Sequence, residues 1–324
     1  MSFLEQLPMP FFALAPMDDV TDTVFRQIIA DIAPPDLYFT EFVNVDGLQS
    51  PGRPKLLHKL SFSNIEKPII AQLWGLKPEN FYKTTQEIIK MGFDGVDINM
   101  GCPVKTVIKN GACAALMNNR ELAGQIIDAV QQAAGETPAC RQAGFPVSVK
   151  TRTGFYNTDL AWIEFLLSKK LNMLTVHGRT VKQLSIVPAD WKLIGEIKKM
   201  RDFLSPDTKI IGNGDVKTRQ QGLELAKKYD LDGIMIGRGI FDDPFVFAQN
   251  SLWSKYAKQQ KIDLYRKHVK LFAQTWQNKE RKIETLNKFC KVYISGFGEA
   301  KQLREQLMSA KEINELINTL DSNI

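Results

Sequence analysis

Short apolar runs alternate with longer amphipathic stretches over the first three quarters of the chain. Eight runs have the length and β-branched content of strands. They are residues 11–16, 37–41, 69–74, 95–99, 147–151, 173–178, 209–214 and 233–238. The stretches between them carry apolar residues at helical spacing, as Phe81, Ile88 and Met91 do within 78–92. This alternation predicts an α/β fold with a parallel sheet.

The number and spacing of these units favour a closed barrel. Eight strand–helix units in about 240 residues fit a (β/α)8 TIM barrel, which typically takes about 250 residues. The rival is a doubly wound open sheet, which would place G-x-G-x-x-G after the first strand. The chain reads APMDDVTD there. We therefore predict a TIM barrel.

Beyond the eighth run the pattern indicates helices only. Apolar residues recur at helical spacing over 264–276 and again over 301–320, and a further helix is expected over 285–295. We therefore predict two domains. Residues 1–247 form the barrel, which would be the catalytic domain, and residues 248–324 form a small all-α bundle.

Positive charge is concentrated in the predicted bundle. The net charge of the chain is +6. The residues from 250 onward hold 14 Lys or Arg against 8 Asp or Glu, so they carry the whole excess. A charge run of this kind is usually a solvated helical face. The alternative is a module that binds a polyanion, and the two stay open on composition alone.

Composition excludes several classes of protein. Hydrophobic residues make up 44% and charged residues 24%, which is ordinary for a folded protein. No run approaches the ~20 apolar residues of a membrane helix, and the start MSFLEQLPMPFF lacks the features of a signal peptide. Four cysteines without a C-x-x-C pair argue against a disulfide framework or a zinc site. We expect a cytoplasmic protein with no membrane contact and no metal.

Almost every predicted strand ends in a polar side chain. In TIM barrels the active site lies at the carboxyl ends of the strands. The polar residues there are Glu41, Gln72, Asn99, Lys150, Arg152, His177, Arg179, Asn213, Asp215 and Arg238. Because polar groups near a core are costly unless something uses them, so many together indicate a binding site.

Three of these features suggest a cofactor. The glycine turns IGNGD and IGRG follow the seventh and eighth strands, where barrels commonly bind phosphate. Lys150 ends a strand and suits a ligand with an anionic ring edge, such as a flavin, and Gln72 could hydrogen-bond the same ring. His177 is either a cofactor contact or a satisfied core histidine.

The motifs of this chain resemble those of the tRNA-dihydrouridine synthases. The matching segments are APMDDVTDTVFR, QLWG, DINMGCPVKTVIKNGACAALM, VSVKTRTGF, TVHGRT, ADWKLI, IIGNGDV and DGIMIGRGIFDDPFVF. They run from about residue 10 to residue 247. The tail that follows resembles the family's in being helical, but fewer of its residues match. The resemblance implies an FMN enzyme that reduces the 5,6 double bond of particular uridines in tRNA, with NADPH reducing the flavin.

The resemblance also implies roles for individual residues. Those expected at the flavin are Pro16, Met17, Asp18, Gln72, Lys150, His177, Asn213, Gly214, Asp215, Gly237 and Arg238. Asn99 would hold the uracil, and Cys102 would be the proton donor. Candidates for holding the RNA beyond the same strand ends are Lys105, Lys109, Arg152 and Arg179. The basic tail would grip tRNA phosphates, and we expect a monomer.

Three positions depart from the family pattern. Asp19 replaces the usual glycine of P-M-x-G-V-T-D, and Cys113 replaces the second glycine of G-A-G-A-A. The segment QLSIVPADW lacks the usual glycine before A-D-W. These differences bear on loop shape and substrate position, and none of them changes a residue with a direct chemical role.

The chemistry of such a reduction gives an independent reason for an acid at Cys102. Hydride goes to C6 of uracil, and an acid on the opposite face must protonate C5. A thiol of pKa ~8.5 is mostly protonated at neutral pH, whereas a carboxylate is ionised. The Gly-Cys-Pro turn gives rigid placement. Cys102 is therefore interpreted as an acid, and Cys113, Cys140 and Cys290 as small buried apolar residues.

Two other functions stay open. One is an FMN barrel oxidoreductase that acts on a free small molecule, of the dihydroorotate dehydrogenase kind. The basic tail and the Gly-Cys-Pro motif speak against it. The other is a catalytically idle tRNA-binding protein, which would bind no flavin and would not depend on Cys102.

Overall fold

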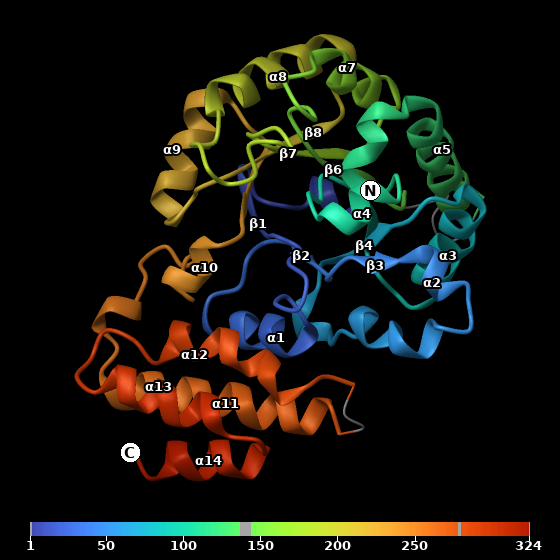
Figure 1. Ribbon diagram of the computed structural model, residues 1–324. Helices are drawn as coiled ribbons and strands as arrows, with labels where there is room; N and C mark the ends of the chain where they lie inside the picture. Colours follow the sequence, from blue (N-terminus) through green and yellow to red (C-terminus); the bar gives the residue numbers. More distant parts are fainter. Residues whose placement is uncertain (1, 137–143, 278–279, 324) are drawn as a thin grey trace.

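The computed structural model describes residues 2–136, 144–277 and 280–323, and it confirms the predicted TIM barrel (Figure 1). Each of the eight predicted runs contains a strand. These strands are β1 (Phe11–Leu14), β2 (Tyr38–Phe39), β4 (Ile69–Trp74), β5 (Gly95–Met100), β6 (Val147–Arg152), β7 (Met173–His177), β8 (Lys209–Asn213) and β9 (Gly233–Ile236). A further two-residue strand, β3 (Val43–Asn44), follows β2, and both pair with β4.

The strand pairing brings distant polar residues to the same level of the barrel. All pairs are parallel, in the order β1-β9-β8-β7-β6-β5-β4-β2, and a bridge between Ala13 and Leu37 links the two ends of this path. The register places Asn99 opposite Lys150, and His177 opposite Asn213. Parallel pairing therefore gathers the strand-end residues around one mouth.

The barrel interior is apolar where the strands begin and polar where they end. Alternate residues of a strand point inward. Phe11, Met173 and Ile211 pack inside with Leu4, whose N-terminal segment closes this end. Higher along the strands the buried residues are polar, including Gln72, Asp97, Asn99, Ser148 and Thr175. The polar half of the barrel is therefore the half that can bind a ligand.

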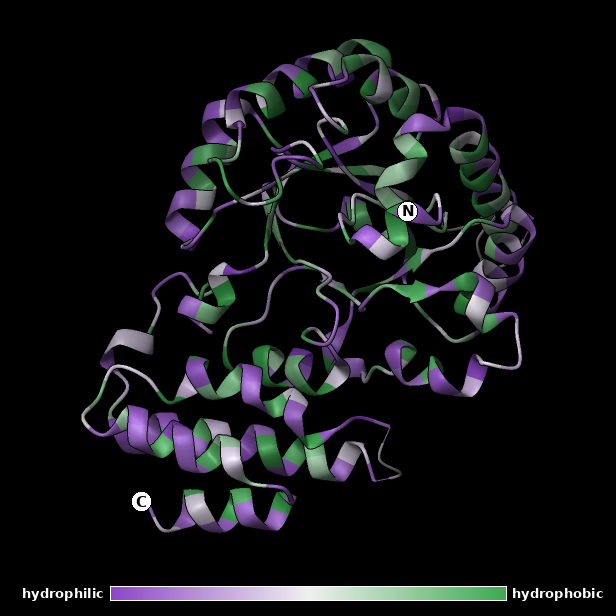
Figure 2. Ribbon diagram, viewed as in Figure 1, coloured by the Kyte–Doolittle hydropathy of each residue, from purple (hydrophilic) through white to green (hydrophobic). Residues whose placement is uncertain are grey.

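Helices surround the barrel, as the amphipathic stretches predict. The longer ones are α1 (Thr23–Ile32), α3 (Pro78–Lys90), α5 (Arg120–Glu136), α7 (Leu160–Ser168), α8 (Trp191–Leu204) and α9 (Arg219–Tyr229). Three short ones are α2 (Val45–Leu48), α4 (Lys105–Lys109) and α10 (Gly239–Asp242). Several of them begin with a side chain that accepts a backbone N–H bond, including Asp22, Asp159, Asp190 and Thr218. Figure 2 shows hydrophobic and hydrophilic residues mixed along each outer helix, as expected for helices with one buried face.

The last quarter of the chain is a helical bundle beside α1 (Figure 1). Its helices are α11 (Lys258–Thr275), α12 (Asn287–Tyr293), α13 (Ala300–Ser309) and α14 (Ile313–Asp321). The stretch 301–320 forms two helices rather than one, because the backbone is extended at Ala310 and α14 folds back onto α11. The predicted boundary after residue 247 falls between α10 and α11, and it stays a prediction. Among the described residues, we find no helix with the length and apolar content needed to span a membrane.

Aromatic residues join the bundle to the barrel. Phe25 of α1 contacts Phe289 of α12, with ring centroids 4.9 Å apart, and lies 6.0 Å from the ring of His268. All three side chains are buried. Burial lowers the pKa of His268 to about 3, so its imidazole is neutral and packs as part of this core. The bundle is thus fixed on one side of the barrel.

A buried arginine adds a polar contact between bundle and barrel. The Arg281 side chain is 3% exposed and hydrogen-bonds the fully buried Glu41 at the end of the second strand region. Its Nε also lies 3.4 Å from a carboxylate oxygen of Asp22. Glu41 in turn accepts a hydrogen bond from the backbone N–H of Asp19. Arg281 therefore neutralises carboxylates that would otherwise be buried without a cation.

Carboxylate oxygens of Asp18, Asp19 and Glu41 lie within 4.8 Å of one another. Lysines share the neutralisation of this cluster with Arg281. Lys59 pairs with Asp18, and Lys288 lies 3.6 Å from Asp19. The cluster is balanced by cations of the chain itself, and the sequence-based expectation of no metal stays a prediction.

Replacing Arg281 with alanine is expected to lower the free energy of unfolding by about 3–5 kcal/mol, because breaking a buried ion pair leaves an unpaired buried charge. Urea unfolding of purified protein would measure the change. The matched control is Lys267→Ala, which removes an exposed pair with Asp31 between the same two parts of the chain. We expect that control to cost less than about 1 kcal/mol. Equal effects of the two variants would contradict the structural role of Arg281.

Candidate active site

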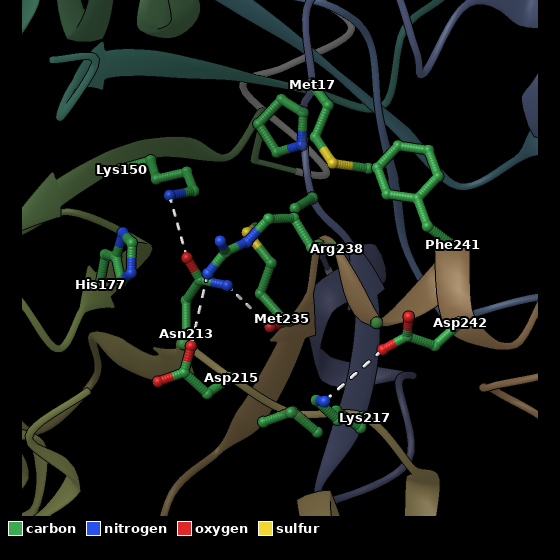
Figure 3. A pocket seen from close by; sticks show the side chains of 16 residues that line it. Met17, Lys150, His177, Asn213, Asp215, Lys217, Met235, Arg238, Phe241 and Asp242 are labelled. Carbon is green, nitrogen blue, oxygen red and sulfur yellow. Dashed lines mark hydrogen bonds and ion pairs between the residues drawn. The ribbon is translucent and has the colours of Figure 1, made fainter. Parts of the chain in front are cut away.

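A cavity of about 540 Å³ lies at the carboxyl ends of β1, β6, β7, β8 and β9 (Figure 3). It gathers all of the predicted flavin residues except Asp18 and Gln72. The gathered residues are Pro16, Met17, Lys150, His177, Asn213, Gly214, Asp215, Gly237 and Arg238. Also in its wall are Lys217, Met235, Phe241 and Asp242, which sequence reasoning did not select. The cavity has the size of a small-molecule or cofactor site.

Lys150 supplies a partly buried cation in this cavity. Its Nζ donates to Oδ1 of Asn213 at 3.3 Å, and Nδ2 of Asn213 donates to the carbonyl of Met235 at 2.8 Å (Figure 3). Burial lowers the pKa of Lys150 to about 8, so the amine is still largely protonated at neutral pH. The site therefore holds a positive charge in the wall of the cavity.

His177 is neutral. Burial, with the positive charges of Lys150 and Arg152 nearby, lowers its pKa to about 2. Nη1 of Arg179 lies 3.1 Å from Nε2 of the imidazole. Because a guanidinium only donates, Nε2 is the acceptor and Nδ1 carries the hydrogen. His177 can therefore donate one hydrogen bond without bringing charge.

The loops after β7, β8 and β9 are tied together around Asp215. This carboxylate accepts hydrogen bonds from Arg179 and from the backbone N–H of Ala189, the latter at 2.9 Å, and lies 3.4 Å from Arg238. The preceding Gly214 has φ +139°, and a Cβ there would come within 2.5 Å of Ala189. Glycine is thus required where the cavity wall turns.

Two cations stand at the rim of this wall. The side chain of Arg238 is 62% exposed and that of Lys217 is 71% exposed, while Lys217 lies 3.7 Å from Asp242 (Figure 3). Their charged ends remain accessible to a ligand. This end of the cavity therefore suits an anionic group.

Gln72 and Asn99 lie in a hydrogen-bonded network within the barrel. Nδ2 of Asn99 donates to Oε1 of Gln72 at 2.9 Å, and Nε2 of Gln72 donates to Asp97 at 2.7 Å. Asp97 also accepts from the hydroxyl of Ser148 at 2.6 Å, and burial raises its pKa to about 6. The side-chain amides of Gln72 and Asn99 thus hold neighbouring side chains in place by hydrogen bonds. Sequence reasoning missed Asp97, although an acidic residue inside an apolar run is a visible signal.

Asn99 also fixes the turn that carries Cys102. Its Oδ1 accepts the backbone N–H groups of Gly101 at 3.1 Å and Cys102 at 3.0 Å. Gly101 lies so close to β6 that a Cβ would be 3.2 Å from the backbone of Thr151. Pro103 follows and restricts the chain further. The cysteine therefore has little freedom to move.

Cys102 is not among the residues that line the cavity. The residue is 8% exposed. The neighbouring Cys113 thiol and the backbone N–H of Val104 lower the pKa of Cys102 to about 7, against the opposing effect of burial. Lys150 and Arg152 are close enough to interact with it electrostatically. Cys102 is thus a weak acid poised near neutral pH.

The four predicted RNA contacts divide into two kinds. Lys105 and Lys109 are exposed on α4. Arg152 is buried, and it donates to the carbonyls of Gly101 at 2.9 Å and of Leu184 at 3.1 Å. Arg179 is also buried and binds the neighbouring loops. The structure therefore places the arginines as supports of the loops and the lysines at the surface.

Comparison with known proteins matches almost the whole chain. A family model described as dihydrouridine synthase (Dus) covers residues 13–324.

The chain belongs to the dihydrouridine synthase family.

Two relatives of this family member illustrate the match. A protein of Staphylococcus aureus (strain COL) named "Probable tRNA-dihydrouridine synthase" is 42% identical over 323 residues, which cover 99% of this chain and 95% of the relative. A "Probable tRNA-dihydrouridine synthase 2" of Bacillus subtilis (strain 168) is 41% identical over 323 residues, with 99% and 96% coverage.

Solved structures resemble this dihydrouridine synthase in fold. A variant of NCR from Zymomonas mobilis has a TM-score of 0.50 and 16% identity, over 75% of this chain and 89% of the other. Morphinone reductase in complex with tetrahydroNAD has a TM-score of 0.50 and 12% identity, over 76% and 90%. At such low identity the likeness shows the barrel fold alone.

Two departures from the family pattern share a backbone conformation. Asp19 has φ +54° and Cys113 has φ +53°, and both stand where this family usually has glycine. Glycine adopts positive φ without strain, so the family pattern has a physical reason. Here the same turns are made by side-chain-bearing residues, and Cys113 is near enough to Cys102 to lower its pKa. Cys140 lies outside the described residues.

Proposed function

We propose that this chain is an FMN-dependent enzyme that reduces the C5=C6 bond of particular uridines in tRNA, with NADPH as reductant. One observation carries the proposal beyond family membership. A rigidly held thiol, Cys102, with its pKa lowered to about 7, lies within electrostatic reach of Lys150, whose side chain lines the cavity. A base reduction needs these two elements, an acid for carbon and a site for an electron carrier, next to each other.

The cavity fits a flavin mononucleotide by volume and chemistry. Its volume of about 540 Å³ is in the usual range of cofactor sites, about 300–1,000 Å³. Met17 and Met235 offer apolar surface for a ring system, and Lys150 suits the ring edge that becomes anionic on reduction. Arg238 and Lys217 at the rim suit a phosphate. FMN bound there would supply hydride chemistry.

The chain's own residues supply binding and proton transfer. Lys150 holds positive charge at the cofactor, and His177 donates a neutral hydrogen bond from Nδ1. Cys102 carries the proton on Sγ that C5 of uracil receives. Asn99 holds this sulfur in place through two backbone N–H bonds. Arg152 and Arg179 position the loops that surround the mouth.

Positive surface connects the mouth of the cavity to the bundle. Phe241 and Asp242 line both the main cavity and a second one of about 430 Å³, whose other residues include Lys288 and Lys291 of α12. Both lysines are exposed. A tRNA backbone can therefore run from these lysines toward the mouth, where a uridine turned out of its stack would enter.

The state of the cysteines supports a reducing compartment such as the cytoplasm. Cys102, Cys113 and Cys290 are free, and no disulfide occurs among the residues that the structure describes. A thiol acid needs to stay reduced to work. The monomer expected from the sequence stays a prediction.

A direct assay tests the proposed function. Purified protein is expected to carry bound flavin that NADPH reduces under anaerobic conditions, and unmodified tRNA should reoxidise it and gain two hydrogen atoms at one or more uridines, measured by mass spectrometry. Free uridine or orotate serves as the comparison substrate. If a free pyrimidine reoxidised the flavin as fast as unmodified tRNA does, the small-molecule oxidoreductase would be favoured. Protein without flavin that still binds tRNA would favour the catalytically idle binder.

A further inference from the structure

Asp97 is a fully buried carboxylate inside the barrel that the proposed chemistry does not use. It lies on β5 between Gln72 of β4 and Ser148 of β6, and the strand register places the three residues at one level. Asn99 follows two positions later on the same face of β5, one level nearer the mouth. Because the interior of such barrels is usually filled by branched apolar side chains, a buried charge here needs a reason.

Hydrogen bonds form a continuous chain from Asp97 to the turn that carries Cys102. A carboxylate oxygen of Asp97 accepts from Nε2 of Gln72 at 2.7 Å, and Oε1 of Gln72 accepts from Nδ2 of Asn99 at 2.9 Å. Oδ1 of Asn99 then accepts the backbone N–H groups of Gly101 and Cys102, at 3.1 and 3.0 Å. The three polar side chains of this chain are buried, so little water competes for its bonds.

Every bond in this chain points the same way, and its two ends fix that direction. The backbone N–H groups of the turn only donate, so Asn99 must present its oxygen to them and its Nδ2 to Gln72. Gln72 must then present Oε1 to Asn99 and Nε2 to a neighbour that accepts, and Asp97 is that neighbour. Burial raises the pKa of Asp97 to about 6, against hydrogen bonds from Ser148 and Gln72. The carboxylate is therefore largely ionised at neutral pH and only accepts.

We propose that Asp97 is a positioning residue for the reaction, because the hydrogen-bond acceptor that it provides keeps both amides in the one orientation that holds the turn of Cys102. The proposal rests on the proposed function, in which Cys102 is the acid. Asp97 touches neither substrate nor cofactor in this scheme and acts only through Gln72 and Asn99. Proton transfer depends steeply on where the acid lies, and a misplacement of about 1 Å can cost about 10²-fold in rate.

Loss of this acceptor would leave Nε2 of Gln72 buried without its partner. An unpaired buried donor is unfavourable, so the amide of Gln72 would turn toward another acceptor. A turned amide would present Nε2 to Nδ2 of Asn99, and two donors repel each other. Asn99 would then lose its hold on the N–H groups of Gly101 and Cys102. The turn that carries the acid would gain freedom to move.

Three variants separate the acceptor from the charge and from the packing. Asp97→Val removes the acceptor and keeps a β-branched side chain suited to a strand. Asp97→Asn removes the charge, but its amide oxygen can still accept from Gln72 while its Nδ2 donates to the hydroxyl oxygen of Ser148. The matched control is Ser148→Ala, which removes the other hydrogen bond to Asp97, at 2.6 Å, and leaves the chain toward Asn99 complete. Thermal unfolding would confirm that the variants fold, and Asp97→Ala takes the place of Asp97→Val if that variant does not.

The first readout is hydrogen–deuterium exchange of the turn, residues 101–103, by mass spectrometry of peptides that span 99–104. The proline of the turn has no N–H, so the two amides that Asn99 binds are its only exchangeable backbone hydrogens. Their exchange should be at least about 10-fold faster in Asp97→Val than in the wild type, because the turn opens more often. Exchange in Asp97→Asn and Ser148→Ala should stay close to that of the wild type. Unchanged exchange in Asp97→Val would overturn the proposal.

The second readout is the single-turnover rate of dihydrouridine formation by pre-reduced enzyme, compared at equal flavin content. Asp97→Val should be about 10–100-fold slower than the wild type with unchanged tRNA affinity. Asp97→Asn and Ser148→Ala should react at close to the wild-type rate. An equally slow Asp97→Asn would show that the charge matters rather than the acceptor, and would overturn the proposal. So would a loss of rate in Asp97→Val that disappears once flavin content is equal, because the role would then be merely structural.

The two readouts also separate this proposal from the proposed function. The exchange measurement needs no activity, so it tests the hydrogen-bond chain by itself. A wild type that forms no dihydrouridine would refute the proposed function, and with it any role of Asp97 in the reaction. Faster exchange in Asp97→Val together with a slower reaction would support both.

Discussion

Replacing Cys102 with alanine is expected to lower dihydrouridine formation by about 10²–10⁴-fold, the usual contribution of a positioned general acid. Alanine leaves the turn intact, because Asn99 binds the backbone of residue 102 rather than its side chain. Flavin content and tRNA affinity should therefore stay close to those of the wild type. Single-turnover assays with pre-reduced enzyme would measure the chemical step directly.

Two further variants sharpen this test. Cys102→Ser keeps a hydroxyl of much lower acidity, so its activity should be nearly as low as that of alanine. Cys290→Ala, which removes a buried thiol inside the helical bundle, should keep full activity. If Cys102→Ala reduced tRNA at close to the wild-type rate, another group would have to be the acid.

Replacing Lys150 with methionine is expected to weaken flavin binding by about 10–100-fold, because a charge-assisted hydrogen bond in a buried site contributes about 1.5–3 kcal/mol. Methionine has similar volume, so the change removes the charge and leaves the wall largely filled. Reduction by NADPH should also slow, since the cation that favours the reduced ring is gone. Equilibrium dialysis of flavin and anaerobic stopped-flow reduction would measure the two effects.

The control for this prediction is Lys198→Met. Lys198 is also nearly buried and pairs with Asp202 and Asp230, both at 2.8 Å, but it lies on the outer helix α8. Its loss should cost some stability and leave flavin affinity unchanged. Lys150→Met with undiminished flavin affinity and an unchanged reduction rate would remove Lys150 from the cofactor site.

The fold is predictable from the sequence because its signals are local. Each strand is a short apolar run, each outer helix has apolar residues at helical spacing, and glycine turns mark the ends of β8 and β9. Parallel strands of a barrel end at one mouth, so the polar residues at the strand ends are expected to lie together. Lys150, His177 and Asn213 do gather around one cavity. Strand order alone does not say which strand-end residues face a ligand and which face the protein.

The partners of the supporting residues have no local signal. Arg281 pairs with Glu41 across 240 positions of the chain, and Asp97 lies between Gln72 and Ser148 from neighbouring strands. Each of these contacts exists because a buried polar group must be matched in charge or hydrogen bonding by whatever packs against it. The sequence determines which polar side chain is present, and the packing of the folded chain determines which residue pairs with it.

The amino-acid sequence by itself thus determined the barrel, the helical bundle, the family and the position of Cys102 in a rigid turn, because these depend on periodicity and on motifs of a few adjacent residues. The tertiary structure alone decided that Arg152 and Arg179 hold loops and that Asn99 fixes the cysteine turn. The physical reason is that hydrogen bonds and charge pairs form between side chains that folding brings within about 3 Å, and no pattern along the chain records that distance.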